Sequence, residues 1–151
     1  KESVYLRYPK ATRPWQHVLE PLSGYLWLAA LMMDNSKTYS DAWNFGPSDE
    51  DIVTVEDVVK EVISLSSDGA YKVKAEVGLH EANLLKLDIS KARSTLKWRP
   101  VYRIAEALRK TICWYERYYE ENNNDIYEYT VKQIEDYIKT AQDNSLEWCK
   151  S

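Results

Sequence analysis

Cysteine is nearly absent from this chain of 151 residues. Cys113 and Cys149 are too few for the disulfide framework of a small secreted domain, so we expect a reducing, cytoplasmic setting. No His or Cys pair has the close spacing of zinc ligands, and no metal site is predicted. The longest apolar run, residues 25–33, is far shorter than the roughly 20 residues that a membrane span needs. No basic-then-apolar signal opens the chain.

Glycine is also scarce, and its four copies are scattered at positions 24, 46, 69 and 78. A dinucleotide-binding site needs a Gly-rich turn between a strand and a helix, so the sequence predicts no such site in this chain. The formal net charge of −4 argues against a nucleic-acid binder, which normally presents a basic face. Lys1, Arg7, Lys10 and Arg13 make the first residues locally basic, which suits a small anionic ligand better than a polyanion.

The length suits one globular domain with a real core. There is no internal repeat and no linker long enough to divide the chain. Because the first residue is Lys1 and not Met, we expect a piece of something longer.

Hydrophobic periodicity predicts a mixed order of strands and helices. Strands are expected at residues 4–7, at 42–45 before Gly46-Pro47, and at 71–77, where apolar and charged residues alternate. A helix with Pro21 in its first turn should stop at residues 34–36. Another should begin at Thr54, whose partner Asp57 would complete an acidic variant of the capping box.

Three further helices are expected in the second half of the chain. The first, capped by Asp88 or Ser90, should end near Leu96, and the second should span residues 104–121. A last helix should carry an apolar stripe. The stripe consists of Tyr127, Val131, Ile134, Ile138 and Ala141. The predicted fold class is therefore α/β with helices in the majority.

The segment 13–22 carries the most distinctive chemistry. Arg13 offers a planar fork that matches phosphate oxygens, and Trp15 offers a flat apolar face with one N–H donor. Gln16 could add amide hydrogen bonds. A surface Arg13 that stacks on Trp15 is the alternative for that residue. His17 has the intrinsic pKa of a general base, but a His ahead of a helix more often packs or caps there, so we assign it a structural or substrate-lining role.

The string Arg13-Pro14-Trp15-Gln16-His17-Val18 closely resembles a stretch of the CDP-glucose 4,6-dehydratases. These are extended short-chain dehydrogenase/reductase enzymes that act on nucleotide sugars. A second match is Asp88-Ile89-Ser90-Lys91-Ala92 followed by Leu96 and Trp98-Arg99-Pro100, with Lys97 where the family usually has Gly. His80-Glu81-Ala82 is also typical of these dehydratases. The resemblance runs from about residue 1 to residue 137.

The resemblance implies that residues 1–151 are the C-terminal nucleotide-sugar-binding portion of a Rossmann-like fold, with the NAD-binding portion absent. The family's catalytic Tyr-x-x-x-Lys pair does not occur here, so no catalytic residue is assigned and the chain alone is expected to be inactive. The implied substrate-binding residues are Arg13, Trp15, Gln16, His17, His80 and Glu81.

The family's reaction converts CDP-glucose to CDP-4-dehydro-6-deoxyglucose and water, with NAD as an internal redox cofactor. The product serves deoxysugar, surface polysaccharide and lipopolysaccharide biosynthesis. The implied partners are CDP-glucose, the missing N-terminal portion of the polypeptide and other copies of the complete enzyme. Two alternatives stay open: another nucleotide-sugar epimerase or dehydratase, and a stand-alone, non-enzymatic binding or oligomerisation module.

Overall fold

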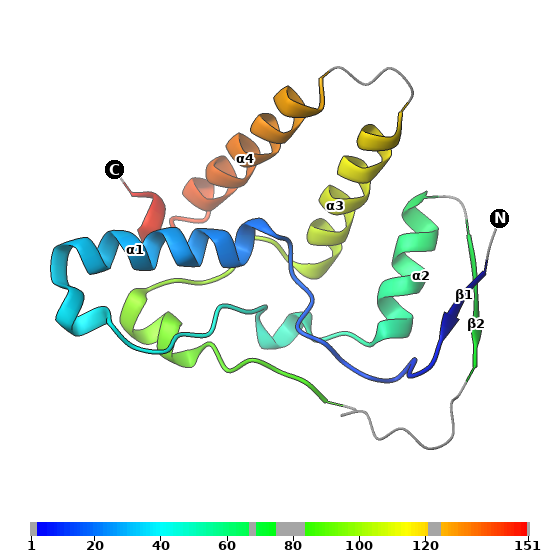
Figure 1. The fold of residues 1–151 in the computed structure, drawn as a ribbon, viewed down its shortest axis with the longest axis horizontal. Coiled ribbons are helices and arrows are strands. Elements are labelled where there is room, and N and C mark those ends of the chain that lie inside the picture. Colours follow the sequence, from blue (N-terminus) through cyan, green and yellow to red (C-terminus); the bar gives the residue numbers. More distant parts are fainter. Residues whose placement is uncertain (1–2, 67–68, 75–83, 121–124, 151) are drawn as a thin grey trace.

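The structure, a computed structural model, describes residues 3–66, 69–74, 84–120 and 125–150. Within this part, α-helices predominate over two short strands (Figure 1). In chain order the elements are β1 Ser3–Leu6, α1 Leu19–Tyr39, α2 Val55–Ser66, β2 Ala70–Val73, α3 Ile104–Tyr119 and α4 Ile126–Asp143. Short helical turns lie at Asp49–Asp51, Ala92–Leu96 and Glu147–Cys149. The prediction of a helix-rich α/β chain is confirmed.

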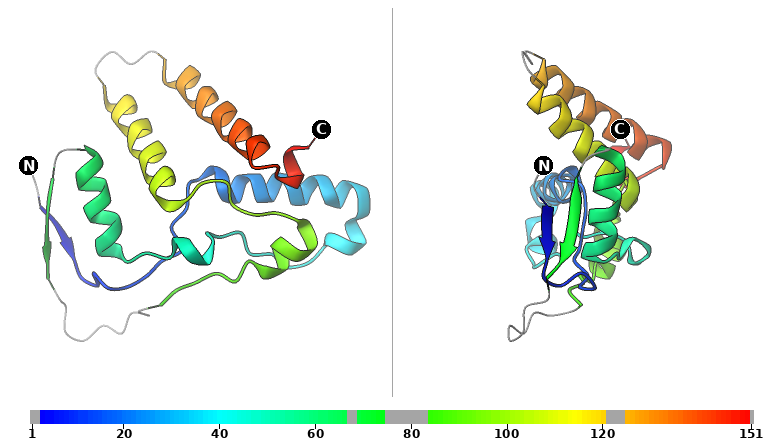
Figure 2. Two further views of the ribbon diagram at one scale, coloured as in Figure 1. Left: turned by 180° about the vertical axis from the view of Figure 1, so that it is seen from behind. Right: turned by 90° about the vertical axis from the view of Figure 1, so that its right-hand side faces the viewer.

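α1 lies parallel to the long axis in one half of the molecule, and α2 and the two strands lie at the opposite end (Figure 1). α3 and α4 form an antiparallel hairpin, and α2 packs between α3 and the two strands (Figures 1 and 2). β1 and β2 pair in parallel, from Ser3 opposite Ala70 to Leu6 opposite Val73. None of the described helices combines the length and the apolar character that crossing a membrane requires.

The capping box predicted ahead of α2 is confirmed. Thr54 Oγ1 accepts a hydrogen bond from the Asp57 backbone N–H at 3.1 Å, and Asp57 Oδ2 accepts one from the Thr54 backbone N–H at 3.1 Å. This reciprocal pair satisfies two backbone donors that the first turn of a helix leaves open. The local sequence supplies this cap, and the distant carbonyls of Ala11 and Pro9 accept the Val55 and Glu56 backbone N–H groups, each at 2.9 Å.

The strand predicted at residues 42–45 is wrong, because no strand is assigned there. Polar groups of this segment form hydrogen bonds with residues that lie outside the two strands. Asn44 Nδ2 donates to the Asp88 carbonyl at 3.2 Å, and the Phe45 carbonyl accepts a hydrogen bond from Gln16 Nε2 at 3.1 Å. β2 ends at Val73, and the rest of the predicted strand, from residue 75, lies outside the described residues.

The predicted stop at residues 34–36 is a kink within α1. Asn35 has non-helical dihedral angles, φ −146° and ψ 80°, and the helix continues to Tyr39. The Asn35 side chain accepts a hydrogen bond from the Thr38 backbone N–H at 3.1 Å. Asn can therefore cap a new turn at the position where the sequence signalled an end.

Lys97 adopts the left-handed conformation, with φ 56° and ψ 20°, at the position where the dehydratase pattern usually has Gly. A side chain is disfavoured there, because Cβ crowds the following carbonyl. The turn places the next residue, Trp98, in the interior. Its side chain is fully buried, and its indole Nε1 donates a hydrogen bond to Ser23 Oγ at 3.1 Å.

Two buried clusters form the core. One gathers Phe45, Ile89, Ala92, Leu96 and Trp98. The other gathers Val101, Tyr102, Ala107, Tyr137, Ala141 and Leu146. Trp148 packs against both clusters and stacks on the Tyr137 ring, with 5.8 Å between ring centroids. The two clusters are therefore joined through one indole.

Candidate functional site

The segment that the sequence singled out links Thr12 to the N-terminus of α1. Thr12 makes bridges to Thr54 and to Leu84, and the neighbouring Ala11 is buried. The Trp15 backbone N–H donates to the Arg13 carbonyl at 2.8 Å, which tightens the chain before the helix. The segment is thus held at its beginning by two distant parts of the sequence.

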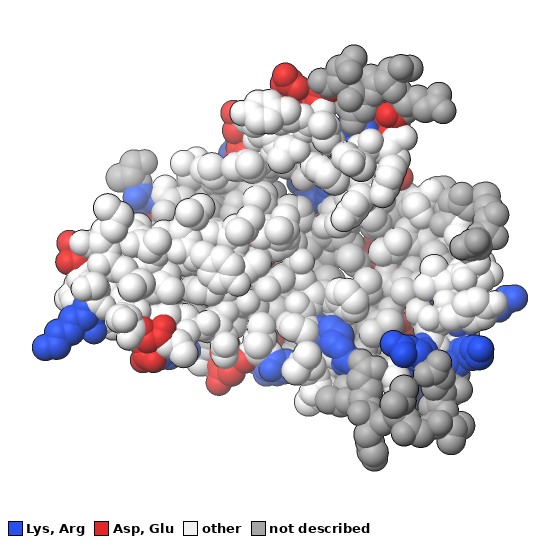
Figure 3. Space-filling model, viewed as in Figure 1, with Lys and Arg blue, Asp and Glu red and all other residues white. Residues whose placement is uncertain are grey.

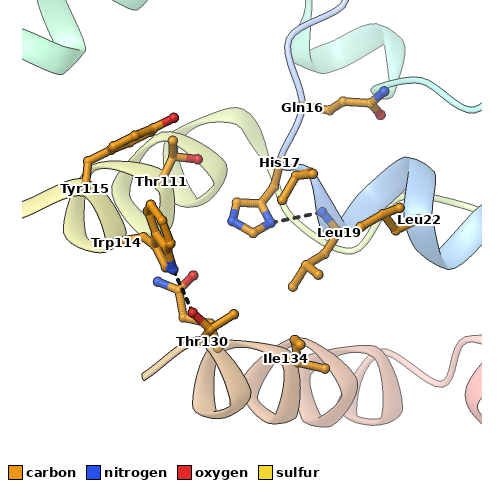
Figure 4. Close-up of a pocket in the computed structure, with 11 residues that line it drawn as sticks. Gln16, His17, Leu19, Leu22, Thr111, Trp114, Tyr115, Thr130 and Ile134 are labelled. Atoms are coloured by element: carbon orange, nitrogen blue, oxygen red, sulfur yellow. Dashed lines mark hydrogen bonds between the residues drawn. The ribbon is translucent and has the colours of Figure 1, made fainter. Parts of the chain in front are cut away.

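The four predicted ligand residues of this segment do not converge on one point. Arg13 Nη1 donates to the Thr12 carbonyl at 2.7 Å, and Trp15 Nε1 is buried without a hydrogen-bond partner among the described residues. Gln16 reaches the Phe45 carbonyl and points away from His17 (Figure 4). His80 and Glu81, the other two predicted residues, lie outside the described residues.

Gln16 and His17 line a cavity of about 580 Å³ between the beginning of α1 and the α3–α4 hairpin (Figure 4). Arg13 and Trp15 are not among its lining residues. The other side chains of the wall are Val18, Leu19, Leu22, Thr111, Trp114, Tyr115, Thr130, Gln133 and Ile134. The cavity is therefore mainly apolar and aromatic, which is typical of small-molecule sites.

Most polar groups of this wall are already bonded within the protein. Trp114 Nε1 donates to Thr130 Oγ1 at 2.9 Å, as the dashed line in Figure 4 shows. Thr111 Oγ1 donates to the Ala107 carbonyl at 2.8 Å. These bonds fix the orientation of the side chains and leave apolar surface toward the cavity. A ligand would meet a preformed wall.

The His17 imidazole is one polar group of the wall that remains for a ligand, and Gln16 Oε1, buried without a hydrogen-bond partner among the described residues, is another. His17 is 5% exposed, and its Nδ1 accepts the Leu19 backbone N–H at 3.3 Å. Burial, and to a lesser degree the positive charge of Lys110, lowers the pKa of His17 below 6.5, so the ring is neutral near pH 7. Because Nδ1 is the acceptor, the proton of the neutral ring sits on Nε2. His17 therefore offers a donor, which favours the substrate-lining role over the general base.

Glu20 is the carboxylate nearest to His17 along the sequence, but it does not orient the imidazole. Its carboxylate accepts the backbone N–H groups of Val101 at 2.9 Å and Tyr102 at 2.8 Å. Instead, the Tyr102 ring meets His17 edge to face, with 5.7 Å between centroids. The imidazole is thus held by a backbone amide and an aromatic ring.

The cavity residues of α3 and α4 could not be predicted as site residues from the sequence. Thr130 and Gln133 are three positions apart and hence share a helix face, but polar residues at this spacing usually face solvent. Gln133 is buried, and its Nε2 donates to the Lys110 carbonyl of α3 at 3.0 Å. A buried Gln that joins two helices leaves no signal in a single sequence.

The glycines of the described residues serve packing and turns and do not form a nucleotide-binding loop. Gly24 lies against the Phe45 ring, Gly46 lies against Leu87, and Gly69 has φ 117°. The strand-to-helix connections described here carry no Gly-rich turn of the kind that NAD binding uses. These residues therefore do not fit NAD. The described residues also hold no cluster of three potential metal ligands.

Similarity to characterised proteins covers almost the whole chain. It is 38% identical over 141 residues to the CDP-glucose 4,6-dehydratase of Salmonella typhimurium, a match of 93% of this chain and 39% of that enzyme. It is 28% identical over 116 residues to UDP-glucuronic acid decarboxylase 1 of Xenopus tropicalis, covering 77% of this chain and 26% of that protein. No protein-family model matches. The chain spans well under half the length of either relative and resembles, over nearly all of its own length, a CDP-glucose 4,6-dehydratase, as the string that begins at Arg13 predicted.

Proposed function

We propose that this chain is the nucleotide-sugar-binding portion of a CDP-glucose 4,6-dehydratase with the Rossmann-like fold of the extended short-chain dehydrogenase/reductases. The 38% identity over 93% of the chain carries the proposal. The complete enzyme would be a cytoplasmic lyase that converts CDP-glucose to CDP-4-dehydro-6-deoxyglucose and water, for lipopolysaccharide and related polysaccharide synthesis. NAD would be bound by a portion outside these residues, because the residues present do not fit it.

The cavity at His17 supports a role in binding. Its aromatic wall suits the flat face of a base or the apolar face of a sugar ring. The Nε2–H of His17 suits an acceptor such as a hydroxyl, carbonyl or phosphate oxygen. In the same proposal Arg13 contacts the diphosphate, Trp15 and Gln16 complete the binding surface, and His80 and Glu81 are further contacts. The chain would supply binding and not the chemistry.

Calorimetric titration of the 151-residue chain tests this proposal. We expect CDP-glucose to bind and NAD not to bind. His17→Ala should weaken CDP-glucose binding, whereas Tyr119→Ala, a change at an exposed position of α3, should not. Binding of NAD with micromolar affinity, or equal affinity of both variants and the unchanged chain for CDP-glucose, would contradict the proposal.

A second candidate is a portion of another nucleotide-sugar enzyme. The 28% identity to UDP-glucuronic acid decarboxylase 1 favours it, but over a smaller share of the chain. Titration with UDP-glucose and UDP-glucuronic acid beside CDP-glucose separates the two. Tightest binding of a UDP sugar would favour the second candidate. A stand-alone oligomerisation module would bind none of the three.

A further inference from the structure

The apolar stripes of α1 and α4 are largely exposed. On α1, Leu22 and Leu26 lie at the surface, the latter with 73% of its area accessible. On α4, Ile134 and Ile138, two residues of the apolar stripe that the sequence predicts, also lie at the surface. The buried face of α4 consists of Gln133, Tyr137 and Ala141. Each helix thus presents apolar side chains on a face that the described chain leaves uncovered.

The two stripes face a continuous depression, which we name the α1–α4 trough. The cavity of about 580 Å³ at His17 and a second cavity of about 470 Å³ share Leu19, Leu22 and Ile134. The second cavity is also lined by Ser23, Leu26, Trp27, Ala30, Tyr137, Ile138 and Trp148. No Asp, Glu, Lys or Arg is among the residues that line either cavity.

Buried hydrogen bonds hold the floor of the trough together. Tyr137 donates its hydroxyl hydrogen bond to Glu20 Oε2 at 2.8 Å and lies 3.0 Å from Ser23 Oγ. In Figure 3 the area over α1 is largely free of charged side chains, which gather near the edges. Single exposed apolar residues are common, but a contiguous apolar depression marks a surface that another apolar surface covers.

We infer that the α1–α4 trough seats an apolar face of the polypeptide that dehydratases carry outside the matched segment. This rests on the proposed function. The Salmonella dehydratase matches this chain over only 39% of its length, so more than half of that enzyme lies outside the match. The end of the trough at Leu26 and Ile138 has no charged lining residue and selects an uncharged occupant, because burying an unpaired charge there would be unfavourable. Filling the end at Leu26 and Ile138 would enclose the cavity at His17 between the two portions, a common place for ligand sites.

Thiol labelling tests the inference. Cys113 and Cys149 are first replaced by Ser, and Leu26→Cys or Ile138→Cys then places one thiol in the trough. Tyr119→Cys on α3, outside the lining of both cavities, is the matched control. Each variant is prepared as the isolated chain and as a chimaera in which it replaces the matched segment of the Salmonella dehydratase. Circular dichroism confirms that each protein is folded.

We expect the two trough thiols to react at least about tenfold more slowly in the chimaera than in the isolated chain, with the control unchanged. Equal rates in both proteins would overturn the inference. Protection that already develops in the isolated chain as its concentration rises would also overturn it, and would identify a second copy as the occupant. Turnover of CDP-glucose by the chimaera is measured separately. A protected but inactive chimaera would count against the proposed function and not against the docking.

Discussion

Tyr137 on α4 donates a hydrogen bond to Glu20 on α1 at 2.8 Å, across 117 positions of sequence. Only 1% of the Glu20 surface is accessible, and its two oxygens also accept the Val101 and Tyr102 backbone N–H groups. One buried carboxylate therefore joins α1, α4 and the segment that precedes α3. The cavity at His17 depends on this joint, because its walls come from the same elements.

Glu20→Ala should lower the free energy of unfolding by at least about 2 kcal/mol, since each buried donor left unsatisfied costs roughly 1–3 kcal/mol. Glu20→Gln should cost about 1–2 kcal/mol, because its amide nitrogen cannot accept the hydrogen bond that one carboxylate oxygen receives. Urea unfolding measures both values. The matched control is Glu61→Ala at an exposed position of α2, where a change within about 0.5 kcal/mol is expected. A Glu20→Ala variant as stable as that control would contradict the structural role.

His17 and Glu20 should affect stability with opposite signs as the pH changes. Burial lowers the pKa of His17 below 6.5, so the unfolded chain binds the proton first and stability falls as the pH drops below 6.5. Burial raises the pKa of Glu20 above 4.5, against the opposing effect of its hydrogen bonds. The folded chain then keeps that proton longer, and stability falls as the pH rises above 4.5.

The two effects overlap in the natural chain, so single variants are needed to separate them. Between pH 4.5 and 6.5, His17→Gln should leave a stability that declines with rising pH, and Glu20→Gln should leave one that increases. Urea unfolding across this interval provides the measurement. If His17→Gln retains the loss of stability on acidification below pH 6.5, another group is responsible for it.

Gly24→Ala should destabilise the chain by about 1–3 kcal/mol, the usual range for an overpacked core. A Cβ at position 24 would overlap Phe45 Cδ1 and lie 2.6 Å from Phe45 Cγ. Phe45 is itself buried and meets the Trp98 ring at 4.9 Å between centroids, so it has little room to move. Phe45→Leu in the same chain should recover part of the loss. Thermal unfolding of both variants tests this, and a Gly24→Ala chain of unchanged stability would refute the close contact.

Lys97→Gly should stabilise the chain by about 0.5–1 kcal/mol, because the left-handed backbone at position 97 suits Gly better than Lys. Lys139→Gly, at an exposed position within α4, is the control and should have the opposite effect, a loss of about 1 kcal/mol. Guanidinium unfolding distinguishes the two. Destabilisation by Lys97→Gly would mean that contacts of the Lys97 side chain stabilise the chain by more than its left-handed backbone destabilises it.

Under the proposed function, Arg13→Ala in the complete enzyme should weaken nucleotide-sugar binding by about 1.5–3 kcal/mol, the scale of a hydrogen bond to a charged group. Arg13→Lys should restore little, because the bidentate fork is lost. Arg99→Ala is a matched control, since both guanidinium groups donate to a backbone carbonyl, Arg13 to Thr12 and Arg99 to Asn144. Unchanged affinity for both Arg13 variants would point to the surface role.

Sequence patterns predicted the features that depend on neighbouring residues. The capping box joins Thr54 and Asp57, which lie only three positions apart, and the helices follow from the spacing of their apolar residues. The burial of each helix face could not be predicted in this way. The α4 stripe through Ile134 and Ile138 is open, while Gln133 and Tyr137 are buried, because distant partners on α1 and α3 satisfy their polar groups.

The same reason limited the prediction of the site. Gln16 and His17 stood out through an unusual local composition, and the structure places both in one cavity. Trp114 and Thr130 complete the wall from helices that lie about 100 residues further along the chain, a contact that no local pattern encodes. The predicted strand at residues 42–45 failed because β propensity does not provide a partner strand.

The position of Trp148 has a consequence for how the chain can be cut or extended. Its indole touches both buried clusters and stacks on Tyr137, so a protein ending before residue 148 would open both clusters together. Lys150, two residues later, is exposed, so we expect a tag attached there to leave both clusters intact. Neither cluster can complete its packing without the Trp148 ring, so the last residues of the chain are part of the core and not a dispensable tail.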